Sequence, residues 1–240
     1  MRTLSLRAMA RPMSSDQDAA KKAVAQAALA YVPETGIVGL GTGSTAKHFI
    51  DGVGVLVQQG RKLLAVPTSE QSREQALALG IPLAPADGPW DIDVTVDGAD
   101  EVSADLDLIK GGGAAHTREK IVNHASRKNI IVVDSSKLSK KLGEKWYVPI
   151  EVLAFAHEAT AQALAQFGPL VRREKDGVVV TTDSGNFIYD LSCGVIESPS
   201  DLDARVRAVP GVVETGLFCG RADIVLVAGE NGVQELKKTS

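Results

Sequence analysis

The sequence predicts an α/β protein with a mostly parallel sheet and a second, smaller α+β unit. Two observations predict this class. Up to about residue 142, short apolar runs alternate with helical patterns, and each run ends in a cluster of Gly, Ser, Thr or Asp. Beyond that point, hairpin signals replace the alternation. The chain has 240 residues, of which 44% are hydrophobic and 23% charged, so it has enough apolar material for a folded core.

The first fifteen residues differ from the rest of the chain. They contain arginines but no acidic residue before Asp16. This composition is typical of a transit peptide, but also of a disordered extension behind an upstream start codon, and we favour the extension. We therefore expect residues 1–15 to be disordered. A helix should begin near Asp16, where either Asp16 or Ser15 can cap it, and should run through Ala19–Tyr31.

Four buried strands are predicted in the first part of the chain, with helical patterns such as Ser69–Leu79 and Ala114–Ser126 between them. Strands that alternate with helices imply a parallel sheet with right-handed crossovers. Ligands of such sheets bind beyond the carboxyl ends of the strands, where all four polar clusters lie. The sequence thus predicts one site at that edge. The four runs are Gly36–Leu40, Lys62–Val66, Ile92–Val96 and Ile130–Val133.

The pattern between Gly143 and Glu214 predicts a small α+β unit with an antiparallel sheet. The apolar run Ala222–Ala228 predicts a strand that returns to the first sheet. We therefore expect one domain from residues 16–142 plus 215–240 and a smaller one from 143–214. Within the smaller one, we expect a strand at Lys145–Val152, a helix at Phe155–Phe167, hairpin turns at 176–177 and 183–186, a helix at Asp201–Val209 and a strand after Gly211.

Composition also excludes several classes of function. The formal net charge is −4 and no basic block occurs, which argues against nucleic-acid binding. No run of 18 apolar residues is present, so we expect no membrane span. Cys193 and Cys219 are expected to be reduced thiols in a cytoplasmic protein, because a chain of this size needs no disulfide.

A Gly-rich turn follows the first predicted strand, in the string GLGTGST at residues 39–45. It lacks the third Gly of the dinucleotide fingerprint and the Gly-Lys of a phosphate-binding P-loop. A strand, a tight turn and a helix start rich in hydroxyls remain, and these suit a phosphate group. A plain turn capped by Ser44 explains the same residues about equally well.

The string VDGADEV places Asp97, Asp100 and Glu101 at one strand end. Three acids so close are costly unless they are solvated, paired or used. A solvated acidic turn is one interpretation. A metal site is another, although the four histidines of the chain show no metal-ligand spacing. Lys110 follows, just before the triple glycine 111–113, which lets the backbone approach another group closely.

Two further charged residues belong to the same edge. Glu119 lies on the helix after the triple glycine, where a glutamate is usually a solvated surface residue. Lys137 lies in the cluster DSSK, which could be a helix cap followed by surface charges. Taken together, hydroxyls, backbone N–H groups, aspartates, lysines and one glutamate fit acid/base chemistry on a small phosphorylated polyol.

The strings GLGTGSTAKHFI, VDGADEV, LIKGGGAAHTREKI and VVDSSK, in this order and spacing, resemble ribose-5-phosphate isomerase of the A type. The resemblance runs from about Lys21 to the C-terminus. It implies a Rossmann-like sheet domain with a smaller, ferredoxin-like α+β lid. It also implies a cytoplasmic enzyme without cofactor or metal, which forms homodimers or homotetramers. Such an enzyme interconverts ribose 5-phosphate and ribulose 5-phosphate in the pentose phosphate pathway.

The resemblance also implies roles for individual residues. Glu119 is expected to be the catalytic base, which moves a proton between carbons 2 and 1 of the open-chain sugar through a cis-enediolate. Lys110 would stabilise the oxyanion, and Asp97 and Asp100 would move protons among the hydroxyls. His116 departs from the family's usual Leu and could tune Glu119 or face solvent. The implied substrate-binding residues are Thr42, Gly43, Ser44, Thr45, Asp97, Gly98, Ala99, Asp100, Lys110, Gly111, Gly112, Gly113 and Lys137.

Two other functions are compatible with this scaffold. One is a non-catalytic sensor of sugar phosphates, although such sensors carry a DNA-binding module for which this chain has no room. The other is a different enzyme, such as a CoA transferase or a sugar-phosphate deaminase. Formation of a ketose from ribose 5-phosphate would separate both from the isomerase.

Overall fold

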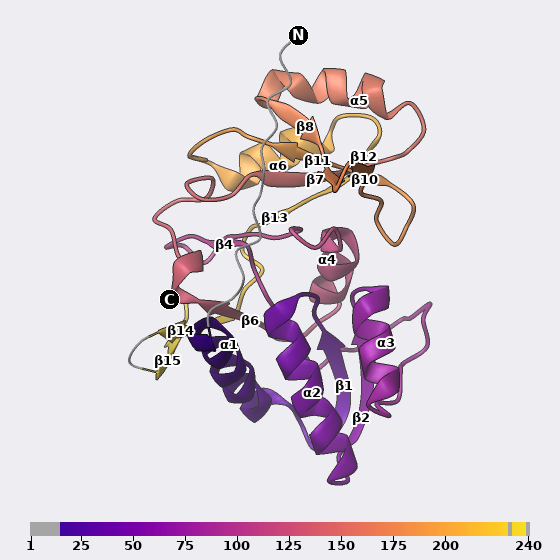
Figure 1. Ribbon diagram of the computed structural model, residues 1–240, viewed down its shortest axis with the longest axis vertical. Helices are drawn as coiled ribbons and strands as arrows, with labels where there is room; N and C mark the ends of the chain where they lie inside the picture. Colours follow the sequence, from indigo (N-terminus) through magenta and orange to yellow (C-terminus); the bar gives the residue numbers. More distant parts are fainter. Residues whose placement is uncertain (1–14, 230–231, 239–240) are drawn as a thin grey trace.

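The computed structural model describes residues 15–229 and 232–238. Residues 1–14, for which we expect disorder, lie outside these described residues. Figure 1 shows two layered units stacked along the long axis of the molecule, with β13 (Leu217–Phe218) and β4 (Glu101–Val102) between them. The first helix, α1 (Ser15–Ala28), begins one residue before the expected start and continues as a 3-10 turn, η1 (Leu29–Tyr31).

A six-stranded sheet forms the core of the first unit, in the order β15-β14-β6-β3-β1-β2. All neighbours pair in parallel except β15, which is antiparallel to β14. The mostly parallel sheet and the returning C-terminal strand are thereby confirmed, whereas β15 was not predicted. The strands are β1 (Thr35–Leu40), β2 (Lys62–Pro67), β3 (Val94–Asp97), β6 (Asn129–Asp134), β14 (Ile224–Gly229) and β15 (Gly232–Leu236).

Helices α1 and α2 lie side by side against this sheet (Figure 1), because their apolar stripes need cover. Val24 of α1 and Phe49 of α2 are fully buried and share one core cluster with Val38 and Ile130 of the sheet. The side chain of Ser69 caps α3 by accepting a hydrogen bond from the Ser72 amide. Besides α1, the helices of this unit are α2 (Ser44–Gln58), α3 (Glu70–Ala78) and α4 (His116–His124).

The second unit is a four-stranded antiparallel sheet in the order β12-β7-β11-β8, with two helices. Its β-α-β-β-α-β succession is that of a ferredoxin-like unit, which confirms the predicted α+β architecture. Leu164 of α5 and Val206 of α6 are buried with Ile150 in a core cluster of its own. The elements are β7 (Val148–Val152), α5 (His157–Leu164), η3 (Ala165–Phe167), β8 (Leu170–Arg172), β11 (Phe187–Leu191), α6 (Pro199–Arg207) and β12 (Val212–Thr215).

Both predicted hairpin turns of the second unit are present. Asp176 and Gly177 adopt positive φ of 53° and 79° between β9 (Glu174–Lys175) and β10 (Val178–Val179). This backbone suits a tight hairpin because it matches the twist of the flanking strands. The second turn is closed by a hydrogen bond from the Thr182 amide to the Asn186 carbonyl.

A three-stranded antiparallel sheet joins the two units in the order β13-β5-β4. Its strands are β4 (Glu101–Val102), β5 (Leu108–Ile109) and β13 (Leu217–Phe218). Just beyond β5, the Lys110 amide donates a hydrogen bond of 2.9 Å to the Gly216 carbonyl. The segment around Gly216, which leads from the second unit back to the first, is therefore hydrogen-bonded to the backbone of Lys110, a predicted site residue. The expected domain boundaries at 142 and 215 stay a prediction.

The sequence predicts neither a membrane span nor a disulfide, and the described residues bear on both expectations. No helix among them has both the length and the apolar character that a membrane crossing needs. Cys193 and Cys219 are free thiols, and burial raises the pKa of each, which disfavours the reactive thiolate. The expectation of unpaired cysteines is thus confirmed.

Candidate active site

A cavity of about 160 Å³ lies beyond the carboxyl ends of β1, β3 and β6. The sequence placed one site at this edge, and the structure brings almost all of the predicted residues to it. Asp97 is buried behind the wall rather than lining it. Four lining residues were not predicted: Lys21, Val132, Val133 and Asp134. The predicted residues that line the cavity are Thr42, Gly43, Ser44, Thr45, Gly98, Ala99, Asp100, Lys110, Gly111, Gly112, Gly113, Glu119 and Lys137.

A buried cation is shared by two buried carboxylates at the inner end of this cavity. The Lys110 Nζ atom lies 2.9 Å from Asp97 Oδ2 and 3.1 Å from Glu119 Oε2, and it donates a hydrogen bond of 2.6 Å to the Gly98 carbonyl. The side chains of all three ionisable residues are at most 5% exposed. Glu119 Oε2 meets Lys110 as an ion pair without hydrogen-bond geometry, so it retains accepting capacity.

Burial and charge shift the acid–base equilibria of this group. Burial, reinforced by the negative charge of Asp97 and opposed by Lys110, raises the pKa of Glu119 to about 8. Burial would lower the pKa of Lys110, but the charges of Asp97 and Glu119 outweigh it and raise that pKa above its ordinary value. Glu119 is therefore poised as a proton carrier near neutral pH, while Lys110 stays cationic.

Asp97 is fixed by backbone donors as well as by Lys110. Its Oδ1 atom accepts hydrogen bonds from the Thr42 amide at 3.0 Å and the Gly98 amide at 2.7 Å. The backbone of Gly41 passes so close that a Cβ atom there would lie 2.2 Å from the same oxygen. Only glycine fits this approach, which explains one glycine of the turn after β1.

Asp100 is bound to the triple-glycine loop. Its Oδ2 atom accepts a hydrogen bond of 2.7 Å from the Gly112 amide. Gly111 has a positive φ of 107°, and a Cβ atom there would lie 2.7 Å from Nδ1 of His116. Glycine at position 111 is thus needed both for its backbone conformation and because helix α4 lies so close to it.

The N-terminus of α2 offers donors for a phosphate at the outer part of the cavity. Gly43, with φ of 110°, precedes the helix, and Ser44 and Thr45 form its first turn. The Lys21 Nζ atom donates a hydrogen bond of 2.9 Å to Ser44 Oγ, which brings a cation from α1 to the same place. Lys137 lies after β6, with its Nζ atom 5.1 Å from the centre of the Trp146 ring. Unpaired helical N–H groups with nearby cations suit an anion.

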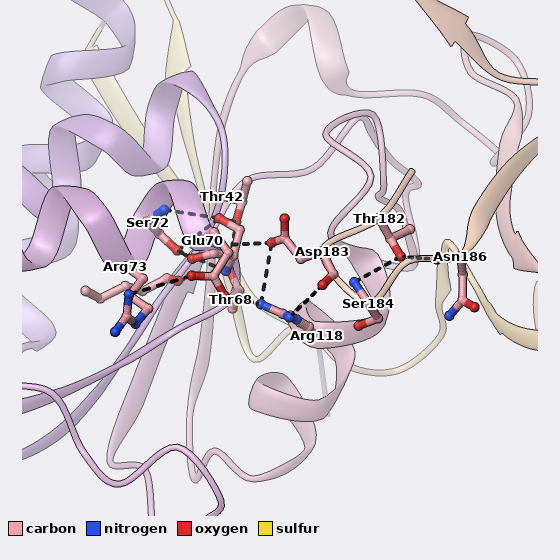
Figure 2. Close-up of polar contacts among 12 residues, drawn as sticks. Thr42, Thr68, Glu70, Ser72, Arg73, Arg118, Thr182, Asp183, Ser184 and Asn186 are labelled. Atoms are coloured by element: carbon pink, nitrogen blue, oxygen red, sulfur yellow. Dashed lines mark hydrogen bonds and ion pairs between the residues drawn. The ribbon is translucent and has the colours of Figure 1, made fainter. Parts of the chain in front are cut away.

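Thr42 connects the cavity to α3 through hydroxyl contacts (Figure 2). Its Oγ1 atom donates a hydrogen bond of 2.8 Å to Ser69 Oγ and lies 2.8 Å from Thr68 Oγ1. Ser69 is the residue that caps α3. The orientation of Thr42 at the cavity therefore depends on the start of the next helix.

A second polar network ties α3 and α4 to the second unit (Figure 2). Arg118 Nη1 lies 3.0 Å from Glu70 Oε1, and Arg118 Nη2 donates to the Asp183 carbonyl at 3.1 Å. Asp183 Oδ2 in turn accepts the Glu70 amide at 2.8 Å. The residue next to Glu119 is thus held by the 183–186 turn of the second unit, a contact that the sequence did not reveal.

His116 is fully buried, which rules out the alternative that it faces solvent. Burial lowers its pKa to about 3, so the ring is neutral at physiological pH. Its Nε2 atom lies 3.3 Å from the Glu214 carbonyl. His116 packs under the triple-glycine loop and contributes to its shape rather than to the charge of the cavity.

Glu101 does not belong to the cavity, although the sequence places it beside Asp100. It is fully buried and accepts hydrogen bonds from Ser139 Oγ and from the amides of Gly143, Lys145 and Trp146, at 2.6 to 3.2 Å. The three acids of VDGADEV are therefore paired separately. Neither a solvated turn nor a convergent metal site describes them, and no group of three potential ligands occurs within the described residues.

A family model described as ribose 5-phosphate isomerase A (phosphoriboisomerase A) matches residues 64–232. The ribose-5-phosphate isomerase A of Thermococcus kodakarensis is 46% identical over 224 residues, which cover 91% of this chain and 97% of that protein. The protein of the same name from Rhodopseudomonas palustris is 45% identical over 234 residues, with 94% and 100% coverage.

Solved structures agree with these sequence matches. The structure of ribose 5-phosphate isomerase A from Methanocaldococcus jannaschii is 40% identical with a TM-score of 0.87, and covers 92% of this chain and 100% of that chain. A D-ribose-5-phosphate isomerase in complex with phospho-erythronic acid is 39% identical with a TM-score of 0.89, at 94% and 100% coverage. The match therefore extends across both units of the fold.

Proposed function

Because the chain belongs to the ribose 5-phosphate isomerase A family, we propose that it interconverts ribose 5-phosphate and ribulose 5-phosphate with Glu119 as the general base. The buried group of Glu119, Lys110 and Asp97 at the inner end of the cavity carries this proposal. A carboxylate of raised pKa beside a fixed ammonium group is what proton transfer next to a carbonyl requires.

The proton transfer has two steps in the aldose-to-ketose direction. The Glu119 carboxylate takes the proton from carbon 2 of the open-chain aldose, and the electron pair of that bond moves toward carbon 1 to give a cis-enediolate. The hydroxyl proton on oxygen 2 then passes to oxygen 1, Glu119 returns its own proton to carbon 1, and the carbonyl forms at carbon 2. Such general-base catalysis is worth roughly 10²–10⁴-fold in rate. One carboxylate serves both steps because carbons 1 and 2 are adjacent.

Negative charge develops on the two oxygens of the enediolate and needs positive charge fixed in advance. Lys110 supports this role because Asp97 and the Gly98 carbonyl hold its ammonium group in place before substrate arrives. A fixed charge in a site of low dielectric stabilises the transition state without reorganisation. Asp100 lines the same cavity, where it can exchange protons with sugar hydroxyls and assist opening of the furanose ring.

The phosphate is the handle that positions the reacting carbons. The N-terminus of α2, with Ser44 and Thr45, and the cations of Lys21 and Lys137 support a phosphate site at the cavity wall. Binding energy from the phosphate can then hold carbons 1 and 2 near Glu119. The relative that was solved with phospho-erythronic acid holds a phosphorylated sugar acid, which is consistent with this substrate class.

A non-catalytic sensor of sugar phosphates is the alternative. A sensor needs donors for the phosphate and hydroxyls but no buried carboxylate of raised pKa beside a buried ammonium group. The residues Glu119 and Lys110 therefore favour turnover. A cytoplasmic location, a homodimeric or homotetrameric state and the two-domain division stay predictions from the sequence.

The test is a direct assay of the purified protein with ribose 5-phosphate, in which ketose formation is followed. We expect turnover by the unaltered protein and a loss of about 10²–10⁴-fold in kcat for Glu119→Gln, with an unchanged thermal midpoint or a higher one. Glu74→Gln, on the exposed face of α3, is the matched control and should keep full activity. Glu119→Gln activity within a few-fold of the unaltered protein would refute the assignment.

A further inference from the structure

Arg173 of the second unit reaches into the triple-glycine loop of the first. It lies between β8 and β9, and its side chain is 11% exposed. Its Nη1 atom donates a hydrogen bond of 2.6 Å to the Gly111 carbonyl and one of 3.2 Å to the Gly112 carbonyl. This buried cation has no role in the proton transfer proposed for Glu119.

The guanidinium group is fixed before any substrate binds. Arg173 Nε donates a hydrogen bond of 3.0 Å to Asp190 Oδ2, and Arg173 Nη2 pairs with Asp190 Oδ1. The planar group also lies over the ring of Tyr147, 5.6 Å from its centre. A guanidinium held by a two-point carboxylate contact keeps its remaining donors in a fixed direction. Those donors point at the glycine loop.

Each of the two carbonyls that Arg173 contacts shares its peptide group with an N–H that points away from Arg173, and Gly112 and Gly113 line the cavity. Carbonyl and N–H point in opposite directions in a trans peptide, and the described residues have a single cis bond, at Gly88-Pro89. The peptide that carries the Gly111 carbonyl ends in the Gly112 N–H, which binds Asp100. The peptide that carries the Gly112 carbonyl ends in the Gly113 N–H.

The Gly113 N–H has no hydrogen-bond partner among the residues that the structure describes, and Gly113 lines the cavity. A cation on the carbonyl side of a peptide group draws electron density toward the oxygen and makes the N–H on the opposite side a stronger donor. Such polarisation along connected hydrogen bonds is strongest where the dielectric is low. The loop also follows Lys110 directly in the chain.

We propose that Arg173 is a positioning residue of the isomerase, which orients and polarises the peptides of the triple-glycine loop for the negative charge formed during the reaction. It acts on the substrate through two groups. The Gly112 N–H fixes Asp100, and the Gly113 N–H is presented to the cavity as a donor for an anionic oxygen. This role rests on the proposed function. It also makes the second unit part of the catalytic device, because Arg173 and Asp190 both belong to it.

A purely structural link between the two units would behave differently. Loss of a structural link lowers the thermal midpoint but leaves the kcat of the folded molecules unchanged. Loss of the directed guanidinium contacts with the two carbonyls lowers kcat and changes KM little, since the interaction is strongest in the transition state. Arg173→Lys separates these cases, because lysine retains a positive charge but cannot bind Asp190 and both carbonyls at once.

The experiment compares kcat, KM and the thermal midpoint for Arg173→Lys, Arg173→Ala and the control Arg172→Gln. Arg172 is the preceding residue, its side chain is 34% exposed, and it pairs with Glu174. For Arg173→Lys we expect kcat to fall about 10- to 100-fold with KM within about threefold, somewhat less than the loss for a donor that contacts the oxyanion directly. The control should retain full activity.

Chemical rescue gives a readout that a structural role would not move. Guanidinium chloride at concentrations far below those that unfold the protein should restore part of the kcat of Arg173→Ala, whereas sodium chloride at equal ionic strength should not. If Arg173→Ala does not fold, the Arg173→Lys kinetics alone decide. A kcat unchanged in folded Arg173→Lys, or a loss confined to KM, would overturn the proposal. Absence of turnover by the unaltered protein would instead refute the proposed function.

Discussion

The Lys110 ammonium group lies 2.9 Å from Oδ2 of Asp97, and the side chains of both residues are at most 5% exposed. Glu119 approaches the same ammonium group from α4 at 3.1 Å. A protonated Glu119 leaves the three-residue group neutral, and an ionised Glu119 leaves it with one negative charge. Burial favours the neutral state, which explains the raised pKa of Glu119. The proposed general-base role needs the other state, in which Glu119 is ionised.

The first prediction concerns the pairing of Lys110 with Asp97. Lys110→Met should lower the free energy of unfolding by about 3–5 kcal/mol, because it leaves a buried carboxylate without its cation. Chemical denaturation measures this loss. Asp97→Asn combined with Lys110→Met should cost less than the sum of the single changes, since neither charge is then left alone. Lys62→Met, at an exposed position of β2, is the control. Additive losses would show that the two side chains do not depend on each other.

Glu101 should contribute to the stability of the fold rather than to the reaction in the cavity. Glu101→Ala removes the acceptor of three backbone amides and one hydroxyl in a fully buried place, so we expect a loss of at least about 3 kcal/mol in unfolding free energy. The kcat of the folded fraction, measured well below the thermal midpoint, should stay within a few-fold. Glu144→Gln, at an exposed residue of the same segment, should leave stability nearly unchanged. A large kcat loss for Glu101→Ala would contradict this division.

Most of the sheet could be predicted because its strands are apolar runs, of which β3, β6 and β14 are buried almost throughout. In the structure β3 begins two residues later than expected and ends one residue later, since Ile92 forms only an isolated bridge to Ser126. β15 escaped prediction because it is an edge strand with mostly exposed residues. The joining strands β4, β5 and β13 have two residues each, too few for any periodicity to appear. Tertiary pairing rather than local pattern makes them strands.

The candidate site could be predicted for a related reason. Carboxyl ends of parallel strands meet at one edge, so clusters far apart in the chain were expected to converge there. Lys21 was missed because a lysine on an amphipathic helix usually faces solvent. Arg118 and Arg173 were missed because their partners, Asp183 and the glycine loop, come from the other unit. Contacts between units depend on how the two pack, which a single sequence does not disclose.

Arg118 should contribute modestly through its contacts with Glu70 and Asp183. Its side chain is one-third exposed, so solvent screening limits the pairs to about 0–1 kcal/mol. Arg118→Gln should therefore change the thermal midpoint little while it lowers kcat/KM a few-fold, because the residue next to Glu119 loses its anchor. Arg73→Gln removes only the weaker 3.8 Å pair with Glu70 and serves as the control. Equal effects of the two substitutions would show that the anchor does not matter for turnover.

Treatment with EDTA should leave the activity unchanged. The acids that could have formed a metal site are engaged separately: Asp97 by Lys110 and two amides, Asp100 by Gly112, and Glu101 by the 139–146 segment. Turnover measured after exhaustive dialysis against EDTA, with and without added divalent cations, checks this. Loss of activity that a metal restores would return the acidic cluster to consideration as a metal site.

The pH dependence of both activity and stability should report on Glu119. As the proposed base, Glu119 is active when ionised, so kcat/KM should rise with pH and level off above an apparent pKa near 8 in the free enzyme. Stability should change in the opposite direction. The folded protein keeps the Glu119 proton up to about pH 8, whereas the unfolded chain releases it near its ordinary pKa of 4.5. Between these values the folded state binds more protons, and unfolding becomes easier as pH rises.

Glu119→Gln separates this contribution from the other titrating groups. Glutamine cannot release a proton, so the variant should lose the part of the stability decline between about pH 4.5 and 8 that Glu119 causes. Denaturant unfolding of both proteins at several pH values gives the difference directly, and Glu74→Gln should follow the unaltered protein throughout. A difference that stays constant across this range would mean that Glu119 is ionised in the folded protein at every pH tested. In that case the ion pair with Lys110 would keep Glu119 ionised, and the rise of kcat/KM near pH 8 would be absent as well.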